Sequence, residues 1–417
     1  MANATVDHMV SVTIFIAALL IFIAFFSQSM QTALSYQQHN SLSTKTSDLL
    51  DTILLNPGLP TSWGHLDSAP VGFGLQDPKY SQYTLSSFSP LRLTYPDELP
   101  VYYTAKNAYY NNLTAGLGGY LLTPIDDGNI KSLSYQRAAE LLGINGTYGF
   151  RLTLTPTIEV DIDKISTGSP LQFALSATGS GFVLANANVT YSLIVVDQDA
   201  TQYPTYRVTS GDCSTDASGS CILPSFSGID GETRSYALIV YARIYGLKGM
   251  GYYVHVPNSF TESVIPMVDS FQNHTVRLAH SDTVGTSVTI PFSELSYNAS
   301  FAMVTDEFTL RQVNLDPTNA TGKITNESNI TKTFTNIELP ANDPGILIVT
   351  YKDTSSGKVG VELVPWGLGS MALPISIGGN SSGYDWVTTD IRQVTIGGIA
   401  YQAKLDLWIP SGYGGSS

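Results

Sequence analysis

Two glycine-rich strings match motifs that carry enzyme chemistry. Residues 379–383, GNSSG, have the spacing of the turn that exposes a nucleophilic serine in hydrolases, and residues 367–372, GLGSMA, have that of a dinucleotide-binding turn. The first needs a following helix and a later histidine, but the last histidine is His280. The second needs a helix that Pro374 would block. We therefore predict two loops, no catalytic or cofactor-binding residue, and no enzyme.

Possible metal ligands are dispersed along the chain. His274 and His280 lie at a spacing that suits no common ligand pair on a helix or a strand. The acidic pairs 161/163 and 197/199 could bind Ca²⁺ at strand ends, but neither has an ordered calcium-loop pattern. We predict no metal site and interpret the acidic pairs as solvated loops, although bound Ca²⁺ stays open.

The chain contains two cysteines, Cys213 and Cys221, separated by residues rich in Gly, Ser and Asp. Such a segment suits a hairpin tip closed by a disulfide. No histidine is close enough in sequence to complete a metal site with them. We predict a Cys213–Cys221 disulfide, with two unpaired thiols as the alternative.

Asparagine sequons are spread over the whole chain, and they are typical of extracellular glycoproteins. One of them, Asn3, precedes the apolar segment at the N-terminus. The predicted N-glycosylation sites are Asn112, Asn145, Asn188, Asn273, Asn298, Asn319, Asn326, Asn329 and Asn380. A by-product of an Asn-, Ser- and Thr-rich composition is the alternative.

An uncharged apolar run, Met9–Phe26, lies near the N-terminus. At about 1.5 Å per helical residue, this run with its flanks can cross a bilayer. Residues 1–7 contain no Lys or Arg, so a cleaved secretory signal is not expected. The predicted membrane or assembly positions here are Met9, Ile14, Ile16, Leu19, Leu20, Ile23 and Phe26. The sequons place the rest of the chain outside the cell.

The helix is expected to continue beyond the membrane, because no Pro or Gly occurs between Val6 and Asn56. Its second half becomes amphipathic, with one apolar stripe that can dock on a folded domain. The stripe consists of Leu42, Leu49, Leu50, Ile53 and Leu54. A simple anchor would need only the first half.

This architecture resembles archaeal type IV pilin-like proteins (pilins, archaellins and pseudopilins). The resemblance is carried by Met9–Phe26 and by residues 47–63, SDLLDTILLNPGLPTSW, and covers roughly the first 65 residues. It implies a helix that sits in the membrane before assembly and in a filament core afterwards, with a β-rich head. The sequence departs from the family in lacking basic residues before the apolar run, so leader cleavage stays open.

The remainder of the chain predicts a mainly β protein. We expect a helix over residues 1–57, a Pro- and Gly-rich wrap with a short helix and strands over 58–155, an Ig-like β-sandwich over 156–266 and a second β domain over 267–417. Strands recur at short intervals from Ile158 to Tyr245, as in sandwiches, and one is expected over Asn188–Val196. Elsewhere we expect a short strand over Leu91–Thr94, a helix over Lys131–Leu142 capped by Ser132 or Ser134, and an exposed loop or hairpin over 314–336. The passage 171–191 resembles bacterial and archaeal Ig-like surface modules.

Composition limits the function further. The formal net charge is −14 and only 13% of residues are charged, so a nucleic-acid partner is not expected. The 24 tyrosines could form an adhesive surface or simply pack across strands.

The predicted partners are the membrane and other copies or pilin-like subunits bound through the helix, with a surface glycan or protein as a possible ligand. We expect a structural cell-surface protein, a subunit or accessory component of a pilus-like filament. The alternative is a non-polymerising, membrane-anchored adhesin that uses the Ig-like domain.

Overall fold

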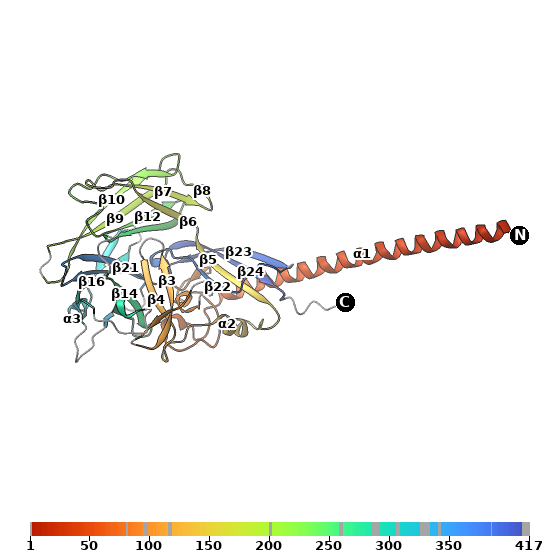
Figure 1. The fold of residues 1–417 in the computed structure, drawn as a ribbon, viewed down its shortest axis with the longest axis horizontal. Coiled ribbons are helices and arrows are strands. Elements are labelled where there is room, and N and C mark those ends of the chain that lie inside the picture. Colours follow the sequence, from red (N-terminus) through yellow and green to blue (C-terminus); the bar gives the residue numbers. More distant parts are fainter. Residues whose placement is uncertain are drawn as a thin grey trace.

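The computed structural model describes residues 2–410 apart from residues 81, 95–98, 105, 116–118, 200–201, 258–261, 285–291, 306–308, 326–333, 341–342 and 385. Its first element is one helix, α1 (Ala2–Leu55), which projects far from a β-rich head (Figure 1). The predicted fold class, mainly β with a long N-terminal helix, is confirmed. The helix ends where Pro57 and Gly58 follow it, as the sequence predicted.

The segment after the helix is a wrap with short elements. These are η1 (Trp63–His65), β1 (Thr84–Leu85), η2 (Ser89–Arg92), β2 (Val101–Tyr103), β3 (Ala108–Ala115), β4 (Gly119–Asp126), α2 (Tyr135–Leu141) and β5 (Gly149–Pro156). The Ser134 side chain accepts a hydrogen bond from the Arg137 backbone N–H and so caps α2, as predicted. The strand predicted over Leu91–Thr94 is wrong, because Pro90 opens a 3-10 turn there instead.

The Ig-like β-sandwich is inserted into this body. Its strands are β6 (Ile158–Lys164), β7 (Phe173–Gly179), β8 (Phe182–Val183), β9 (Asn188–Val196), β10 (Tyr206–Ser214), β11 (Ser220–Ile222), β12 (Tyr236–Ile244) and β13 (Leu247–His255). One layer has the order β10-β9-β12-β13, and the other is β6-β7-β11 with β8 beside β7. A single parallel bridge, Met250 to Glu159, joins the layers at one side.

The last part of the chain returns to the body. Its elements are β14 (Val264–Ser270), β15 (Thr275–His280), η3 (Ser281–Thr283), β16 (Leu295–Val304), β17 (Leu310–Val313), α3 (Pro317–Ala320), β18 (Thr321–Ile324), β19 (Phe334–Glu338), β20 (Gly345–Asp353), β21 (Val359–Trp366), η4 (Leu368–Ser370), β22 (Ile375–Gly378), β23 (Val387–Ile396) and β24 (Ile399–Trp408). The exposed loop or hairpin predicted over 314–336 instead contributes α3, β18 and the start of β19 to the body.

Strands from before and after the sandwich share the two sheets of the body. The five-stranded sheet has the order β1-β23-β24-β5-β22, so β5 lies between two strands from the C-terminal part. In the larger sheet, β4 lies between β21 and β14. Residues 58–155 and 267–417 therefore form one interleaved body, and the chain leaves it after β5 and returns at β14.

One apolar core runs from the helix through the body to the sandwich. It contains Leu50 of α1, Leu405 of β24, Val361 of β21 and Ile239 of β12. A second cluster, including Leu193 and Leu175, fills the space between the two sandwich layers. Strands β9 and β12 are thus covered on both faces, which explains why Tyr236–Ala242 is buried without interruption. The sandwich is consequently stacked on the body (Figure 1).

Candidate functional site: the exposed helix and its junction with the head

The outer part of α1 has no partner in the head. Every described side chain from Val6 to Ser41 is exposed except the half-buried Ser35. Within it, Ile14, Phe22 and Phe26 are each at least 60% exposed. The helix is apolar and long enough to cross a membrane, by length and composition. Water does not tolerate such a row of large apolar side chains, so this surface requires lipid or protein around it.

A polar, uncharged stretch of α1 connects the apolar run to the head. No Asp, Glu, Lys or Arg occurs between Asp7 and Lys45. Residues 27–41 are mostly Gln, Ser, Thr and Asn, and their side chains are also exposed. An isolated helix in water is usually supported by charged pairs one turn apart, and this stretch has none.

The inner part of α1 is docked on the head through the predicted apolar stripe. Leu42 and Leu49 are 4% exposed, and the other three are fully buried. These side chains join the core and contact strands β23 and β24. The structure thus places the apolar stripe on one face of the helix, against the head.

A polar clamp fastens the other side of this helical turn to β23. The Arg392 guanidinium lies 3.2 Å from an Asp51 carboxylate oxygen and donates to the Ser47 hydroxyl at 2.8 Å. It also donates to Asp390 at 2.5 Å. One turn earlier, the hydroxyls of Thr46 and Thr388 are hydrogen bonded at 2.5 Å. The helix is therefore held by both apolar and charged contacts.

The electrostatics of the clamp favour the ionised carboxylate. Partial burial alone would raise the pKa of Asp390, but hydrogen bonds from Ser47 and Arg392 outweigh it, and the pKa is lowered. The charge on Asp390 is thus retained to lower pH than that of an ordinary aspartate.

The residues that follow the helix hold its C-terminal end in place. Gly58 adopts φ +78°, and a Cβ there would lie 2.7 Å from the Trp63 ring nitrogen. That ring is fully buried and its N–H donates to the Gly74 carbonyl at 2.9 Å. The Leu75 N–H in turn donates to the Ile53 carbonyl at 2.8 Å, which satisfies the last turn of α1. The Pro-Gly-Trp string therefore fixes the helix exit.

A buried arginine that the sequence analysis missed organises the same region. Arg92 is fully buried and donates to five backbone carbonyls, those of Trp63, Leu66, Asp67, Ser68 and Lys131. Burial, opposed by Asp67, lowers its pKa to about 10, so it stays charged at neutral pH. Its position inside an apolar string, FSPLRL, is the only sequence signal that could have indicated this role.

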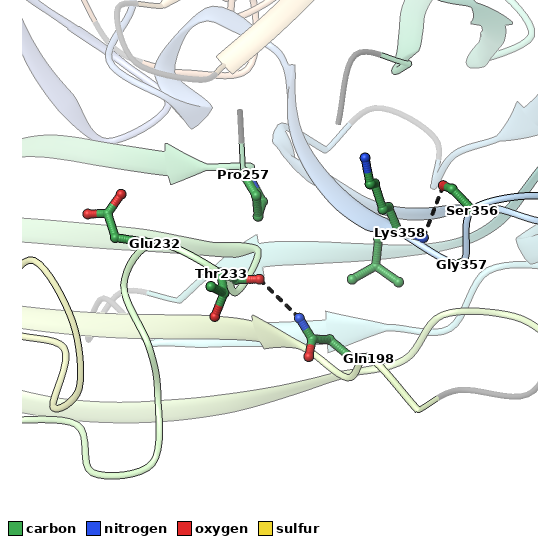
Figure 2. A pocket seen from close by; sticks show the side chains of 8 residues that line it. Gln198, Glu232, Thr233, Pro257, Ser356, Gly357 and Lys358 are labelled. Atoms are coloured by element: carbon green, nitrogen blue, oxygen red, sulfur yellow. Dashed lines mark hydrogen bonds between the residues drawn. The ribbon is translucent and has the colours of Figure 1, made fainter. Parts of the chain in front are cut away.

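A cleft lies where the sandwich meets the body (Figure 2). Its volume is about 340 Å³, and its walls come from both parts: Gln198, Glu232 and Thr233 on one side, and residues 356–359 on the other. The Gln198 amide donates to the Thr233 carbonyl at 3.0 Å. Nearby, the Ser235 hydroxyl donates to the Val359 carbonyl at 2.6 Å, so the two parts are joined at the cleft. Its polar lining could accommodate a small hydrophilic ligand.

The predicted Cys213–Cys221 disulfide is confirmed. The cysteines do not belong to a simple hairpin, however, because β10 pairs with β9 and β11 pairs with β7. The disulfide instead connects the outer strands of the two sandwich layers, opposite the β13–β6 bridge. It therefore closes the sandwich at its second side.

The predicted glycosylation sites differ in accessibility. Exposed side chains are found at Asn145, Asn188, Asn273 and Asn380. Asn112, Asn298 and Asn319 are half-buried. The Asn298 amide nitrogen, the atom that would carry a glycan, donates to the Pro204 carbonyl at 3.0 Å. Asn326 and Asn329 lie outside the described residues.

The motifs examined for catalysis occupy turns. The Asn380 side chain accepts a hydrogen bond from the Ser382 N–H in the turn after β22. None of the described residues between β22 and β23 is helical. The 367–372 string contains η4, a buried 3-10 turn. Asp161 and Asp163, predicted to lie in a solvated loop, lie instead on the exposed face of strand β6. Asp197 follows β9 and pairs with Arg207 at 3.0 Å. The tyrosine clusters include cross-strand pairs such as Tyr102 with Tyr109, whose ring centroids are 5.1 Å apart.

Neither a protein-family model nor a curated protein matches this sequence. Several solved structures show a partial likeness to this chain. The D0-D1 domain of intimin is 14% identical, with 54% of this chain and 98% of that one covered and a TM-score of 0.21. A tetra-tandem repeat from the extending region of a large adhesion protein is 11% identical, covering 57% and 51%, with a TM-score of 0.20.

The BSP domain of a biofilm associated protein is 14% identical, covering 51% of this chain and 30% of that one, with a TM-score of 0.15. TM-scores this low give no information about the function of the chain. What the chain's own residues define is a β-rich protein with a β-sandwich, one disulfide and an exposed apolar helix.

Proposed function

We propose that this protein is a membrane-anchored cell-surface protein whose N-terminal helix assembles with copies of itself, as a subunit or accessory component of a pilus-like filament. The observation that carries the proposal is the helix surface from Val6 to Ser41, which is exposed, continuous and almost free of charge. Its apolar part suits lipid before assembly and helix–helix packing afterwards. The β-rich head, with its accessible sequons, would form the outer surface. The role is structural, without catalysis.

The uncharged polar stretch distinguishes assembly from simple anchoring. In an anchor, residues 27–41 would stand alone in water between the membrane and the head, without charged pairs to support the helix. In an assembly, neighbouring helices would surround them and exchange hydrogen bonds through Gln, Ser and Thr side chains. The clamp at Arg392 would then fix the direction of each head relative to the helix bundle.

Two lysine substitutions test the proposal, with cells sheared to release surface filaments and then fractionated. Phe22→Lys places a charge in the apolar run, and Leu34→Lys places one in the polar stretch, where the leucine is 53% exposed. We expect wild-type chain in the sheared filaments and loss of both variants from them. Gln272→Lys, on an exposed head position, is the matched control and should assemble normally. Wild-type chain found only in detergent-soluble membranes would contradict assembly.

The second candidate is a non-polymerising, membrane-anchored adhesin or binding protein. The cleft between the sandwich and the body favours it, because ligand sites are often found where two domains meet. In that case Leu34→Lys would be harmless, since the residue would face water. Titration of the full-length protein in detergent micelles with surface oligosaccharides, compared with Glu232→Gln, would support this candidate if saturable binding were lost in the variant.

A further inference from the structure

A small group of metal-ligating side chains lies where the chain returns from the sandwich to the body. Glu262 lies two residues before β14, His280 ends β15, and Asp282 lies in η3 just beyond it. The two strands are paired, with Val264 opposite His280, so their register brings the three side chains to one end of the β14–β15 pair. Among the described residues, this is the one group of three such side chains whose potential ligand atoms all lie within 4.8 Å of one another.

The histidine at its centre is buried and incompletely bonded. His280 is 0% exposed, and its Nε2 atom has no hydrogen-bond partner among the described residues. That nitrogen faces Glu262, with 3.9 Å between Nε2 and Oε2, which is too long for a hydrogen bond. The Phe292 ring stacks on the imidazole at a centroid distance of 4.0 Å. A buried polar nitrogen without a partner is costly, so its retention calls for a ligand.

The two carboxylates are arranged around this ring. An Asp282 carboxylate oxygen lies 3.9 Å from Nδ1. One oxygen of each carboxylate lies within 4.8 Å of the other and of a ring nitrogen. The Ser293 hydroxyl donates to the Glu262 carboxylate and orients it. Two atoms that bind one cation at about 2.0–2.2 Å each lie roughly 3–4 Å apart, and the 3.9 Å between Nε2 and Glu262 falls in this range.

We propose that Glu262, His280 and Asp282 bind one divalent transition-metal ion of the Zn²⁺ class. An imidazole nitrogen with two carboxylates is a donor set that suits Zn²⁺, whereas Ca²⁺ and Mg²⁺ prefer oxygen alone. Three protein ligands leave the remaining coordination position to water.

Metal binding through Nε2 would also change the hydrogen bond that the His280 ring now makes. Nδ1 now accepts the Asp282 backbone N–H at 3.2 Å, which places the ring hydrogen on Nε2. Coordination through Nε2 moves that hydrogen to Nδ1 and opens this long bond. The ion would thereby connect the segment before β14 with the segment after β15, and so fix the point at which the chain re-enters the body.

The test uses full-length protein in detergent, stripped with a chelator and titrated with Zn²⁺ alone. We expect saturable binding of one ion per chain and a rise in the thermal unfolding midpoint. Glu262→Gln and Asp282→Asn, both at partly exposed positions, should weaken binding by about tenfold or more and remove most of the midpoint shift. His280→Gln should abolish both, but its buried position makes the two carboxylate variants the decisive ones.

His255→Gln, at a half-buried histidine on β13, is the control and should bind Zn²⁺ as the wild type does. Co²⁺ provides a second readout, because its visible spectrum reports coordination by nitrogen and oxygen ligands at the same site. Equal Zn²⁺ binding by wild type, Glu262→Gln and Asp282→Asn would overturn the proposal. So would the absence of any saturable binding by the wild type.

Discussion

Single residues at the junction determine how the helix is held. Arg392 contacts Asp390 on its own strand. It also contacts Ser47 and Asp51 on α1, which are more than 300 residues away in sequence. The sequence shows the apolar stripe of the helix because five leucines and isoleucines repeat at helical spacing. It does not show the clamp, since nothing local distinguishes Arg392 from any other strand cation.

The first prediction at this scale concerns Asp390. Asp390→Asn should destabilise the head by about 1 kcal/mol at pH 7, because the ion pair with Arg392 is only partly buried. The pKa of Asp390 is lowered in the folded protein. Its ionic contribution is therefore complete above the ordinary aspartate pKa of about 4 and is lost as the pH falls below that value.

Thermal unfolding midpoints at pH 7 and pH 3 check this sign. The difference between wild type and Asp390→Asn should be present at pH 7 and smaller at pH 3. Asp163→Asn, on the exposed face of β6, is the control and should leave the midpoint unchanged within error. A difference that grows as the pH falls would contradict the role assigned to Asp390.

Sequons give a second prediction at the residue scale. Glycan transfer needs a free asparagine amide, so Asn145, Asn188, Asn273 and Asn380 should be occupied in the native protein. Asn298 should be empty, because its amide nitrogen is bonded to the Pro204 carbonyl. Glycopeptide mass spectrometry of protein from its own cells measures this directly. Occupancy at Asn298 with empty exposed sequons would show that accessibility in the fold does not control modification.

At the scale of elements, the sequence predicted those with strong local signals. The unbroken helix followed from the lack of Pro and Gly, and β9 was predicted with its observed bounds, Asn188–Val196. Strand β13 was not among the predicted strands, and Gly249 and Gly251 interrupt its side-chain pattern. The structure explains these glycines, since β13 passes so close to β6 that side chains at these positions would clash with Ile158 and Val160.

Gly251→Ala therefore provides a prediction about the contact between the sandwich layers. A Cβ there would lie 2.2 Å from the Val160 carbonyl oxygen, so the strands must separate. We expect a loss of about 2 kcal/mol of unfolding free energy, measured by chemical denaturation. Gly168→Ala has no heavy atom within 4 Å of the added Cβ and should be close to neutral. Equal effects would mean that the layers do not approach closely at β13.

At the scale of the whole molecule, the chain combines a helix with an exposed apolar surface and a compact β-rich head. The sandwich is closed by the disulfide on one side and by the β13–β6 bridge on the other, and it shares a core with the body. The interleaving of strands from before and after the sandwich was not predictable, because it depends on pairings between distant segments such as β5 and β24. The apolar surface left uncovered is concentrated on α1.

The most direct test of assembly is cross-linking through the helix in intact cells. Both native cysteines are in the disulfide, so one introduced cysteine is the single free thiol of the chain. Ala24→Cys probes the apolar run, Gln38→Cys the polar stretch, and Gln272→Cys the head as control. The account predicts covalent dimers from both helix variants and none from the control after mild oxidation. Monomeric Gln38→Cys protein in its native location would contradict packing of these helices against one another.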